Sequence, residues 1–377
     1  QICEEAIEQV AEVLRSGWIG LGPKTKRFED AFSEYVQAEH AVALNSATSA
    51  LHLALNAIGV RDREVISTPM TFISTNSAIL YCGGRIRFAD IKPGDLKIDP
   101  DRIRERITDQ TRAIVVVHYA GRPCDMTEIQ QIAAERDLWI IEDAAHACGA
   151  VYKGRKIGSS EYPKTMVCFS FHAVKNLPAG DGGMITTDDS EMAALLRKDR
   201  WLGIDKDTFA RTELSDMRSG EAQAYLWRYT VERLGFKAHM NDITAAIALA
   251  QLDRLDVDNG HRAALVDRYR RQIGSGNLPM GGIELLDRTE DRVSANHLFV
   301  IKADRRDDLI RHLKANEIHR GVHYYPNSLY PIMRHQDPDA HLPVAESIWK
   351  RILSLPLHIA LHAEDVDRIV ATIAKGW

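Results

Sequence analysis

The stretch Thr165–Asp189, TMVCFSFHAVKNLPAGDGGMITTDD, contains two short apolar runs separated by a glycine-rich turn. Met166–Phe171 is typical of a buried strand, and Gly182–Thr187 predicts a second one. Lys175 therefore lies in the bend between two strands. A lysine held against an apolar wall loses hydration of its ammonium form, so its pKa falls and its neutral amine can attack an aldehyde. A lone lysine of this kind is more often an exposed loop residue, so other parts of the chain must show whether Lys175 is a reactive amine.

Composition limits the classes of protein. With 377 residues, the chain is long enough for two domains and a large core. Its 48 basic against 53 acidic residues give a net charge of −5, which provides no electrostatic footprint for nucleic acid. We expect a cytoplasmic protein, because the apolar runs near 114–117, 138–141 and 243–250 are too short to span a bilayer and the N-terminus lacks a signal pattern. The scattered cysteines argue for a reducing compartment and against a zinc site: Cys3, Cys82, Cys124, Cys148 and Cys168.

The segment His40–Ala57, HAVALNSATSALHLALNA, predicts a strand, a tight polar turn and a helix. The turn Ser46–Ser49 would present hydroxyls together with the free backbone N–H groups of a helix start, which is an arrangement suited to phosphate. An ordinary helix cap, in which one hydroxyl satisfies the helix start, explains the same residues.

From Glu64 to Asp143 the pattern alternates between strands and helices, with EVISTP, RIRFAD, AIVVVHY and LWIIEDA as strands and MTEIQQIAAERD as a helix. This alternation predicts an α/β fold with a mostly parallel sheet, helices on both faces, and a ligand site at the carboxyl ends of the strands. None of the strands is followed by GxGxxG and a helix, so a nicotinamide cofactor is not expected.

One strand end carries a carboxylate. In IIEDAAHACGA, Asp143 follows an apolar strand, where burying an unpaired carboxylate would be costly, so it needs a cationic partner. The protonated ring nitrogen of pyridoxal phosphate supplies one, and the charged ring then withdraws electrons from a substrate carbon. His146 lies close enough in sequence to reach the same ligand. Alternatively, Asp143 caps a helix and His146 is an interior histidine.

Several motifs together resemble the DegT family of sugar aminotransferases, which depend on pyridoxal phosphate and have fold type I. The motifs are NSATSALHLAL, STPMTFISTN, VHYAG, IIEDAAHACGA, FSFHAVKNLPAGDGGMITTD, HMNDITAAIALAQL and SLPL. Within the family the chain is most similar to members that make 4-amino-4-deoxy sugars. The resemblance implies a mostly parallel seven-stranded sheet between helices in a large domain, residues 1–250, and a smaller C-terminal α+β domain, residues 251–377.

The resemblance also implies roles for individual residues. Lys175 would be the catalytic residue, bound covalently to pyridoxal 5′-phosphate, with pyridoxamine 5′-phosphate as intermediate. The implied cofactor-binding residues are Thr48, Ser49, Phe72, Asp143, His146, Ser170 and Asn241. Asn241 would act from a neighbouring subunit, so a homodimer with shared active sites is expected. His323 and Tyr324 would contact the substrate.

The implied reaction transfers the amino group of glutamate to a keto sugar linked to a nucleotide. His146, which is Gln in many members, favours a 4-keto over a 3-keto sugar. Asp181 stands where the family often has Glu, and Asn327 and Ser328 stand where many members have a further His, a departure that concerns substrate contacts. The alternatives are an aminotransferase for a cyclitol or other cyclic ketone, and a non-catalytic regulatory protein. Lys175 argues against a sugar dehydratase, and the positions of Cys148 and Cys168 beside strands argue against a cysteine desulfurase.

The C-terminal third predicts a strand at HLFVIKA and helices at DDLIRHLKANEI and AEDVDRIVATIA. The last of these places Val366, Ile369, Val370 and Ile373 on one face, which we interpret as core packing. Between the domains, aromatic residues are predicted to line either a substrate entrance or a subunit contact: Trp201, Tyr225, Trp227 and Tyr229.

Overall fold

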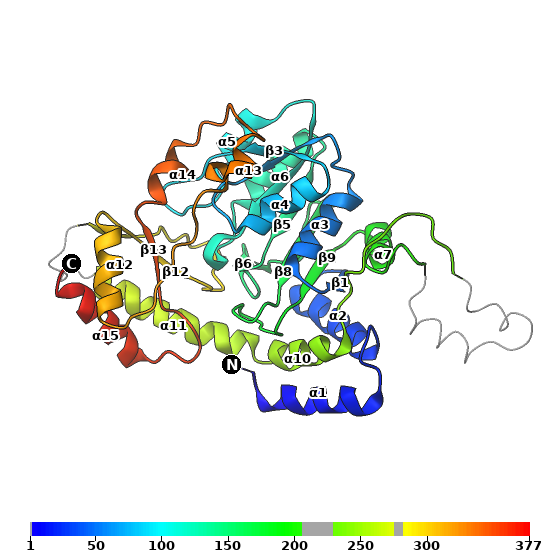
Figure 1. The fold of residues 1–377 in the computed structure, drawn as a ribbon, viewed down its shortest axis with the longest axis horizontal. Coiled ribbons are helices and arrows are strands. Elements are labelled where there is room, and N and C mark those ends of the chain that lie inside the picture. The colour runs from blue at the N-terminus through cyan, green and yellow to red at the C-terminus, as the bar shows by residue number, and fades with distance from the viewer. Residues whose placement is uncertain (1, 206–228, 275–281) are drawn as a thin grey trace, which may run out of the picture.

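A seven-stranded sheet lies at the centre of the computed structural model, which describes residues 2–205, 229–274 and 282–377 (Figure 1). Tyr225 and Trp227 lie outside these residues. The strand order is β1-β9-β8-β5-β4-β2-β3, and β9 alone runs opposite to the others. This confirms the predicted α/β fold and its mostly parallel sheet. The strands are β1 His40–Leu44, β2 Glu64–Ser67, β3 Arg85–Phe88, β4 Thr111–Val117, β5 Trp139–Asp143, β8 Thr165–Ser170 and β9 Gly183–Thr187.

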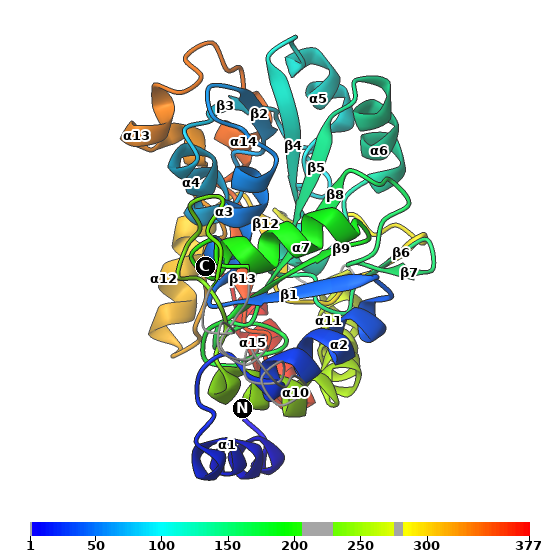
Figure 2. The same ribbon diagram turned by 90° about the vertical axis from the view of Figure 1, so that its right-hand side faces the viewer.

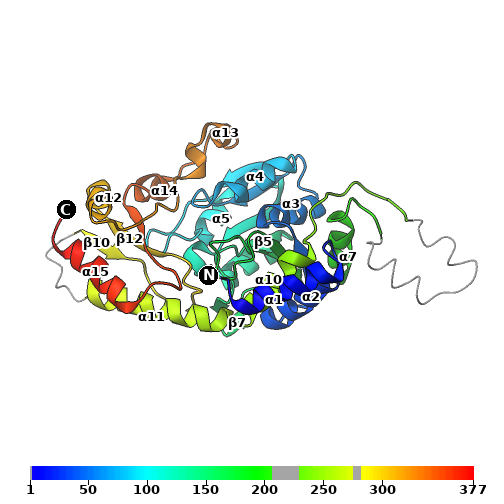
Figure 3. The same ribbon diagram turned by 60° about the horizontal axis from the view of Figure 1, so that its bottom comes forward.

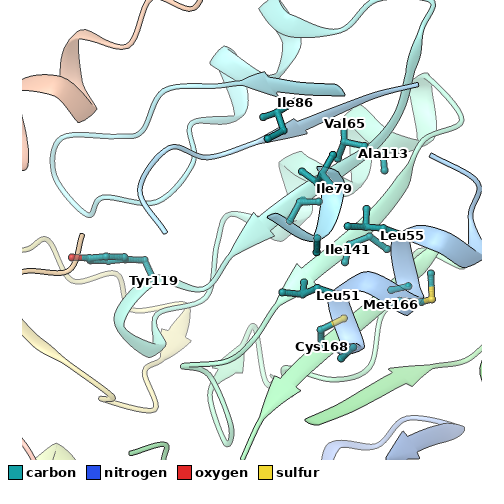
Figure 4. Close-up of a cluster of buried hydrophobic side chains, with 14 of the residues drawn as sticks. Leu51, Leu55, Val65, Ile79, Ile86, Ala113, Tyr119, Ile141, Met166 and Cys168 are labelled. Carbon is teal, nitrogen blue, oxygen red and sulfur yellow. The ribbon is translucent and has the colours of Figure 1, made fainter. Parts of the chain in front are cut away.

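Successive residues of the central strands point to opposite faces and pack under different helices. On β5, Ile141 joins an apolar cluster with Leu51 of α3 and Ile79 of α4 (Figure 4), whereas Ile140 joins a second cluster with Ile129 of α6. Because both faces are covered, the strands are apolar throughout, as is typical of parallel sheets. The helices of the first face are α3 Ala47–Ala57, α4 Ile73–Tyr81 and α7 Ser190–Asp199, and those of the other are α2 Pro23–Val36, α5 Pro100–Arg106, α6 Met126–Glu135 and α10 Asp242–Leu252.

The first helix, α1 Glu4–Ser16, lies along α10 (Figures 1 and 3). It ends at Gly17, whose φ of 78° is the left-handed conformation that glycine adopts at helix ends. Val13 is buried, whereas Ile7 and Leu14 are 56% and 57% exposed.

The C-terminal part contains an antiparallel sheet of β10 Ile283–Leu285, β12 Phe299–Ala303 and β13 Ile352–Leu355. The long helix α11 Leu255–Gly274 runs toward it from the large sheet, beside α12 Arg306–Ala315 and α15 Ala363–Ala374 (Figure 1). The apolar residues predicted on one face of α15 are all buried in this core, which confirms the packing interpretation: Val366, Ile369, Val370 and Ile373.

Part of the C-terminal sequence packs back against the large sheet. Ala345 and Ile348 of α14 join the same apolar cluster as Leu51, and the first turn of α14 donates two backbone N–H groups to Asp90, which follows β3 (Figure 2). The domain boundary at residue 250 stays a prediction. The remaining elements are η1 Tyr119–Gly121, β6 Val151–Tyr152, β7 Arg155–Lys156, β11 Arg292–Val293, η2 Asn327–Leu329, α13 Pro331–Arg334 and α14 Pro343–Ile348. In the described parts of the chain, we find no helix that is both long and apolar enough to cross a bilayer.

Candidate active site

A cavity of about 420 Å³ opens at the carboxyl ends of the sheet strands. The turns after β1, β5 and β8 all contribute to its wall, as expected for a mostly parallel sheet. The structure brings together eight of the residues singled out in the sequence: Thr48, Phe72, Asp143, His146, Ser170, Lys175, His323 and Tyr324. Asp181 also lines the cavity, but Ser49 and Asn241 do not line it.

Lys175 lies in the predicted bend between β8 and β9. Its backbone N–H donates to the His172 carbonyl at 2.8 Å, and the Ala173 N–H donates to Gly180 at 3.0 Å, so the bend is fixed by its own backbone. Burial lowers the pKa of Lys175 to about 8, and the nearby Asp143 carboxylate opposes this effect only in part. No described side chain lies within hydrogen-bonding distance of its Nζ. Near neutral pH a larger fraction of this amine is therefore in the neutral form than for an exposed lysine.

Asp143 ends β5 and is 5% exposed. Its carboxylate accepts the Thr75 hydroxyl at 2.7 Å and the Ala145 N–H at 3.0 Å. Among the described residues, no Lys, Arg or His side chain is within ion-pair distance of it. A buried carboxylate without a cation is costly. The protonated ring nitrogen of pyridoxal phosphate is the cation that this position fits, so this part of the site is compatible with the cofactor.

The start of α3 forms another part of the wall. The Ser46 side chain caps the helix by accepting the Ser49 N–H at 3.1 Å, and the first N–H groups of the helix have no intrahelical acceptor. Gly183 lets β9 approach this turn, because a Cβ there would lie 2.3 Å from the Ser46 carbonyl. Ser170 is buried at the adjacent end of β8. The start of α3, with the hydroxyl groups of Ser46 and Ser170 beside it, fits a phosphate.

Ser49, a predicted phosphate ligand, is turned toward other side chains. Its hydroxyl donates to Asn45 Oδ1 at 2.7 Å and accepts from the Ser46 hydroxyl at 3.1 Å. The cavity wall at this helix start is instead formed by Ser46, Ala47 and Thr48. A phosphate role for Ser49 stays a prediction.

His146 lies in a stack of rings on the opposite wall. Its Nε2 is 3.1 Å from the Tyr324 hydroxyl, and its ring stacks on His297 at 4.3 Å. Burial lowers the pKa of His146 well below its ordinary value, with a further contribution from Lys175. His146 is therefore neutral. Phe72 lies on the open side of the cavity and is 58% exposed.

His297 is a cavity residue that the sequence analysis missed. It is 7% exposed, and its Nδ1 is 2.8 Å from Asn176 Oδ1. The Asn176 Nδ2 donates to Asn259 Oδ1 and to the Ala295 carbonyl, so the amide must present its oxygen to His297. Nδ1 of His297 therefore carries the proton. Its only signal in the sequence was its place as the first residue of the predicted strand HLFVIKA.

The remaining predicted residues lie away from this cavity. Asn241 is exposed and caps α10 by accepting the Thr244 N–H at 2.9 Å. Trp201 packs edge-on against His239, with the Lys237 ammonium over its ring. Asn327 is 1% exposed and bonded to Asn76 and to the Thr71 carbonyl, so it supports the backbone before Phe72 and does not line the cavity.

Comparisons with known proteins agree with this geometry. The chain is 38% identical over 382 residues to the Bacillus subtilis spore coat polysaccharide biosynthesis protein SpsC, covering 99% of this chain and 94% of that protein. The structure matches the sugar aminotransferase CalS13 from Micromonospora echinospora with a TM-score of 0.89 at 29% identity, covering 100% of this chain and 98% of that one.

It also matches the PLP form of Spr1654 from Streptococcus pneumoniae, with a TM-score of 0.88 at 32% identity, covering 100% of this chain and 96% of that one. Spr1654 has been solved in a PMP form as well. The family model described as DegT/DnrJ/EryC1/StrS aminotransferase family matches residues 1–374. The chain therefore belongs to the DegT/DnrJ/EryC1/StrS aminotransferase family and is a transaminase dependent on pyridoxal phosphate.

Proposed function

We propose that this transaminase moves the amino group of glutamate onto a keto sugar linked to a nucleotide, with a 4-keto sugar favoured over a 3-keto sugar. The observation that carries the proposal is the meeting of Lys175 and Asp143 in one cavity. The relatives named above include a sugar aminotransferase and a polysaccharide biosynthesis protein, which supports a sugar as acceptor. His146 supports amination at C4 through the family resemblance.

When bound, pyridoxal phosphate supplies an aldehyde that accepts an amine and a protonated ring that withdraws electrons. In our proposal, Asp143 keeps the proton on the ring nitrogen, and Phe72 packs against the ring. The helix start at Ala47 and Thr48, together with the Ser170 hydroxyl, binds the phosphate. Neutral His146 adds no competing positive charge beside the ring.

Lys175 has two tasks in this scheme. Its amine holds the cofactor covalently in the resting enzyme. With the amino donor bound, the Lys175 amine would take a proton from the donor α-carbon as base and give a proton back as acid. A pKa of about 8 suits both directions, because a proton carrier works best when its pKa is near the working pH.

We also propose a homodimer with shared active sites. Phe72 and Val174 line the cavity but are 58% and 64% exposed, so apolar surface remains at its mouth. A second copy would cover this surface. Asn241 lies outside the cavity of its own chain, and in the dimer it would bind the phosphate of the neighbouring subunit. Asn241→Ala should weaken cofactor binding in that case, which equilibrium dialysis measures.

A desulfurase function finds no support in the two candidate cysteines. Cys148 and Cys168 are 3% and 0% exposed, and burial raises the pKa of both thiols far above the ordinary value. A nucleophilic cysteine needs an accessible, low-pKa thiol. A binding protein without catalytic activity would need neither the buried amine of Lys175 nor the buried carboxylate of Asp143.

Absorbance spectroscopy tests the proposal. The purified protein should be yellow, and L-glutamate alone should bleach this colour as the pyridoxamine form accumulates. Labelled glutamate is then offered with UDP-, dTDP- and GDP-linked 3-keto and 4-keto sugars. We expect label in a 4-keto product. If the label passes only to a free cyclitol, the acceptor is a cyclitol and not a nucleotide-linked sugar. A protein that keeps its colour with every amino donor would contradict a catalytic role.

A further inference from the structure

A second cavity of about 410 Å³ meets the first one at Lys175. The two cavities share Val174, Lys175, His297 and His323 as lining residues. The other walls of the second cavity come from α11 and from the loop after β13, and they include Asp258, Arg262, Leu357, His358 and Ile359. The reactive amine therefore lies between a cavity that fits the cofactor and a second cavity whose walls on α11 and after β13 carry no predicted role.

Arg262 is the notable charge in this second cavity. It is 6% exposed, and its only described hydrogen bond is from Nη1 to the Leu357 carbonyl at 3.2 Å. Its Nε is buried without a partner in the described part of the chain. Burial lowers the pKa of Arg262, and Asp258 opposes this only in part. Asp258 itself lies 4.0 Å from Arg254 and is not in ion-pair contact with Arg262. A buried, incompletely paired guanidinium favours an anionic ligand.

The histidines around the cavity do not offset this charge and do not add to it. His297 carries its proton on Nδ1, as shown by the Asn176 amide, and His323 Nδ1 is 2.8 Å from the Ser354 hydroxyl. Burial lowers the pKa of both rings and that of His358, the third histidine of the wall, so none of the three adds a positive charge. The cavity thus presents the Arg262 guanidinium and the Asp258 carboxylate on α11, and the Lys175 amine at another wall. That pattern matches an amino acid, which carries a carboxylate close to its amine.

We propose that the second cavity binds a carboxylate of the amino-acid donor, with Arg262 as its anchoring cation. The proposal rests on the proposed function and names the subsite that takes the donor. The guanidinium offers a planar pair of N–H donors to a carboxylate, and the cavity leads directly to Lys175. The nucleotide-linked acceptor also carries an anion, its diphosphate, so the test compares the half of the reaction in which glutamate gives up its amine with the half in which the sugar accepts it.

The test separates the two halves of the reaction. Arg262→Gln removes the charge, Arg262→Lys keeps it, and Arg271→Gln on the exposed side of α11 is the matched control. Single-turnover bleaching by L-glutamate measures the first half. Colour recovery of the pyridoxamine form with the best keto sugar measures the second half. Calorimetry of glutarate binding to the Lys175→Ala protein, with and without Arg262→Gln, measures the subsite without catalysis.

We expect Arg262→Gln to raise the half-saturating glutamate concentration at least about 10-fold and to leave the second half within about 3-fold. Arg262→Lys should recover part of the loss, Arg271→Gln should match the parent, and glutarate binding should weaken at least about 10-fold. Equal losses in both halves, or unchanged glutarate binding, would overturn the proposal. If Arg262→Gln does not fold, the same comparison is made with Arg262→Lys, whose loss must again be confined to glutamate and glutarate. If glutamate does not bleach even the parent protein, the proposed function fails, and glutarate binding alone decides the subsite.

Discussion

Two neighbouring carboxylates at the end of β5 are both buried but have opposite surroundings. Glu142 is 3% exposed and 2.8 Å from His118 Nε2. The Cys124 N–H donates to Nδ1 of the same ring, so Nε2 carries the proton that Glu142 accepts. Asp143 is 5% exposed and accepts one hydroxyl and one backbone N–H, with no basic side chain beside it in the described residues.

The difference shows which buried carboxylate stabilises the fold and which one serves the active site. Successive residues of a strand face opposite sides of the sheet, so Glu142 lies on the side of His118 and Asp143 on the side of Lys175. A carboxylate that is satisfied from within the protein contributes to stability. One that lacks a cation is explained by a ligand that supplies it. The predictions below separate these two roles.

Asp143→Asn should give the largest effect. The amide oxygen can still accept the Ala145 N–H, and the Thr75 hydroxyl can turn to accept from the new Nδ2 group, but the amide cannot hold a proton on the ring nitrogen. We expect kcat to fall by about 10²–10³-fold. The free energy of unfolding of the cofactor-free protein should change by less than about 1 kcal/mol, because a costly buried charge is removed. Steady-state kinetics and denaturant unfolding measure the two quantities, and a loss of stability with intact kcat would reverse our assignment.

Glu142→Gln should show the opposite pattern. It weakens the buried contact with His118, so the free energy of unfolding should fall by about 1–3 kcal/mol. Activity at a temperature where the protein is folded should stay within about 3-fold of the parent. The same two assays apply, with Asp143→Asn as the reciprocal control. A large drop in kcat would mean that both acids belong to the site.

Thr75→Val should have a smaller, purely local effect. The Thr75 hydroxyl donates to Asp143 at 2.7 Å and lies 2.7 Å from the Thr71 hydroxyl. Its removal leaves the carboxylate with one donor fewer and free to turn, so we expect kcat to fall about 10-fold. Thr71→Val, which leaves the bond to Asp143 in place, is the control and should lose less. Equal effects of the two variants would contradict a role through Asp143.

The smallest expected effect is a shift in the pH dependence of Lys175. Only the neutral amine reacts with an acylating reagent, so labelling of Lys175 in the cofactor-free protein should rise with pH to a midpoint near 8. The Asp143 carboxylate raises this pKa, so Asp143→Asn should move the midpoint to lower pH, whereas Glu142→Gln should not move it. Peptide mass spectrometry follows the labelling, and a midpoint like that of an exposed lysine would contradict the buried setting.

The sequence predicts this site well where a motif ends a strand. Thr48, Asp143, Ser170 and Lys175 each follow an apolar run, and the parallel sheet brings such ends to one edge. Ser46 was predicted as part of an anion site or as a helix cap. The structure shows that it caps α3 and also lines the cavity.

What the sequence does not predict depends on contacts between distant segments. Arg262 lies in the middle of α11 and His297 precedes β12, and neither position carries a local pattern that marks a cavity. The tautomer of His297 depends on Asn176 and Asn259, which come from two further segments. The hydrogen bond from the Ser49 hydroxyl to Asn45 likewise becomes visible only in the folded turn.

The most direct test of the central claim is to trap the covalent link. The resting protein is reduced with borohydride, digested, and searched by mass spectrometry for the peptide that carries the reduced cofactor. We predict the pyridoxyl group on Lys175, in the parent and in Glu142→Gln alike. A pyridoxyl group on another lysine, or an unmodified Lys175 in fully yellow protein, would contradict it.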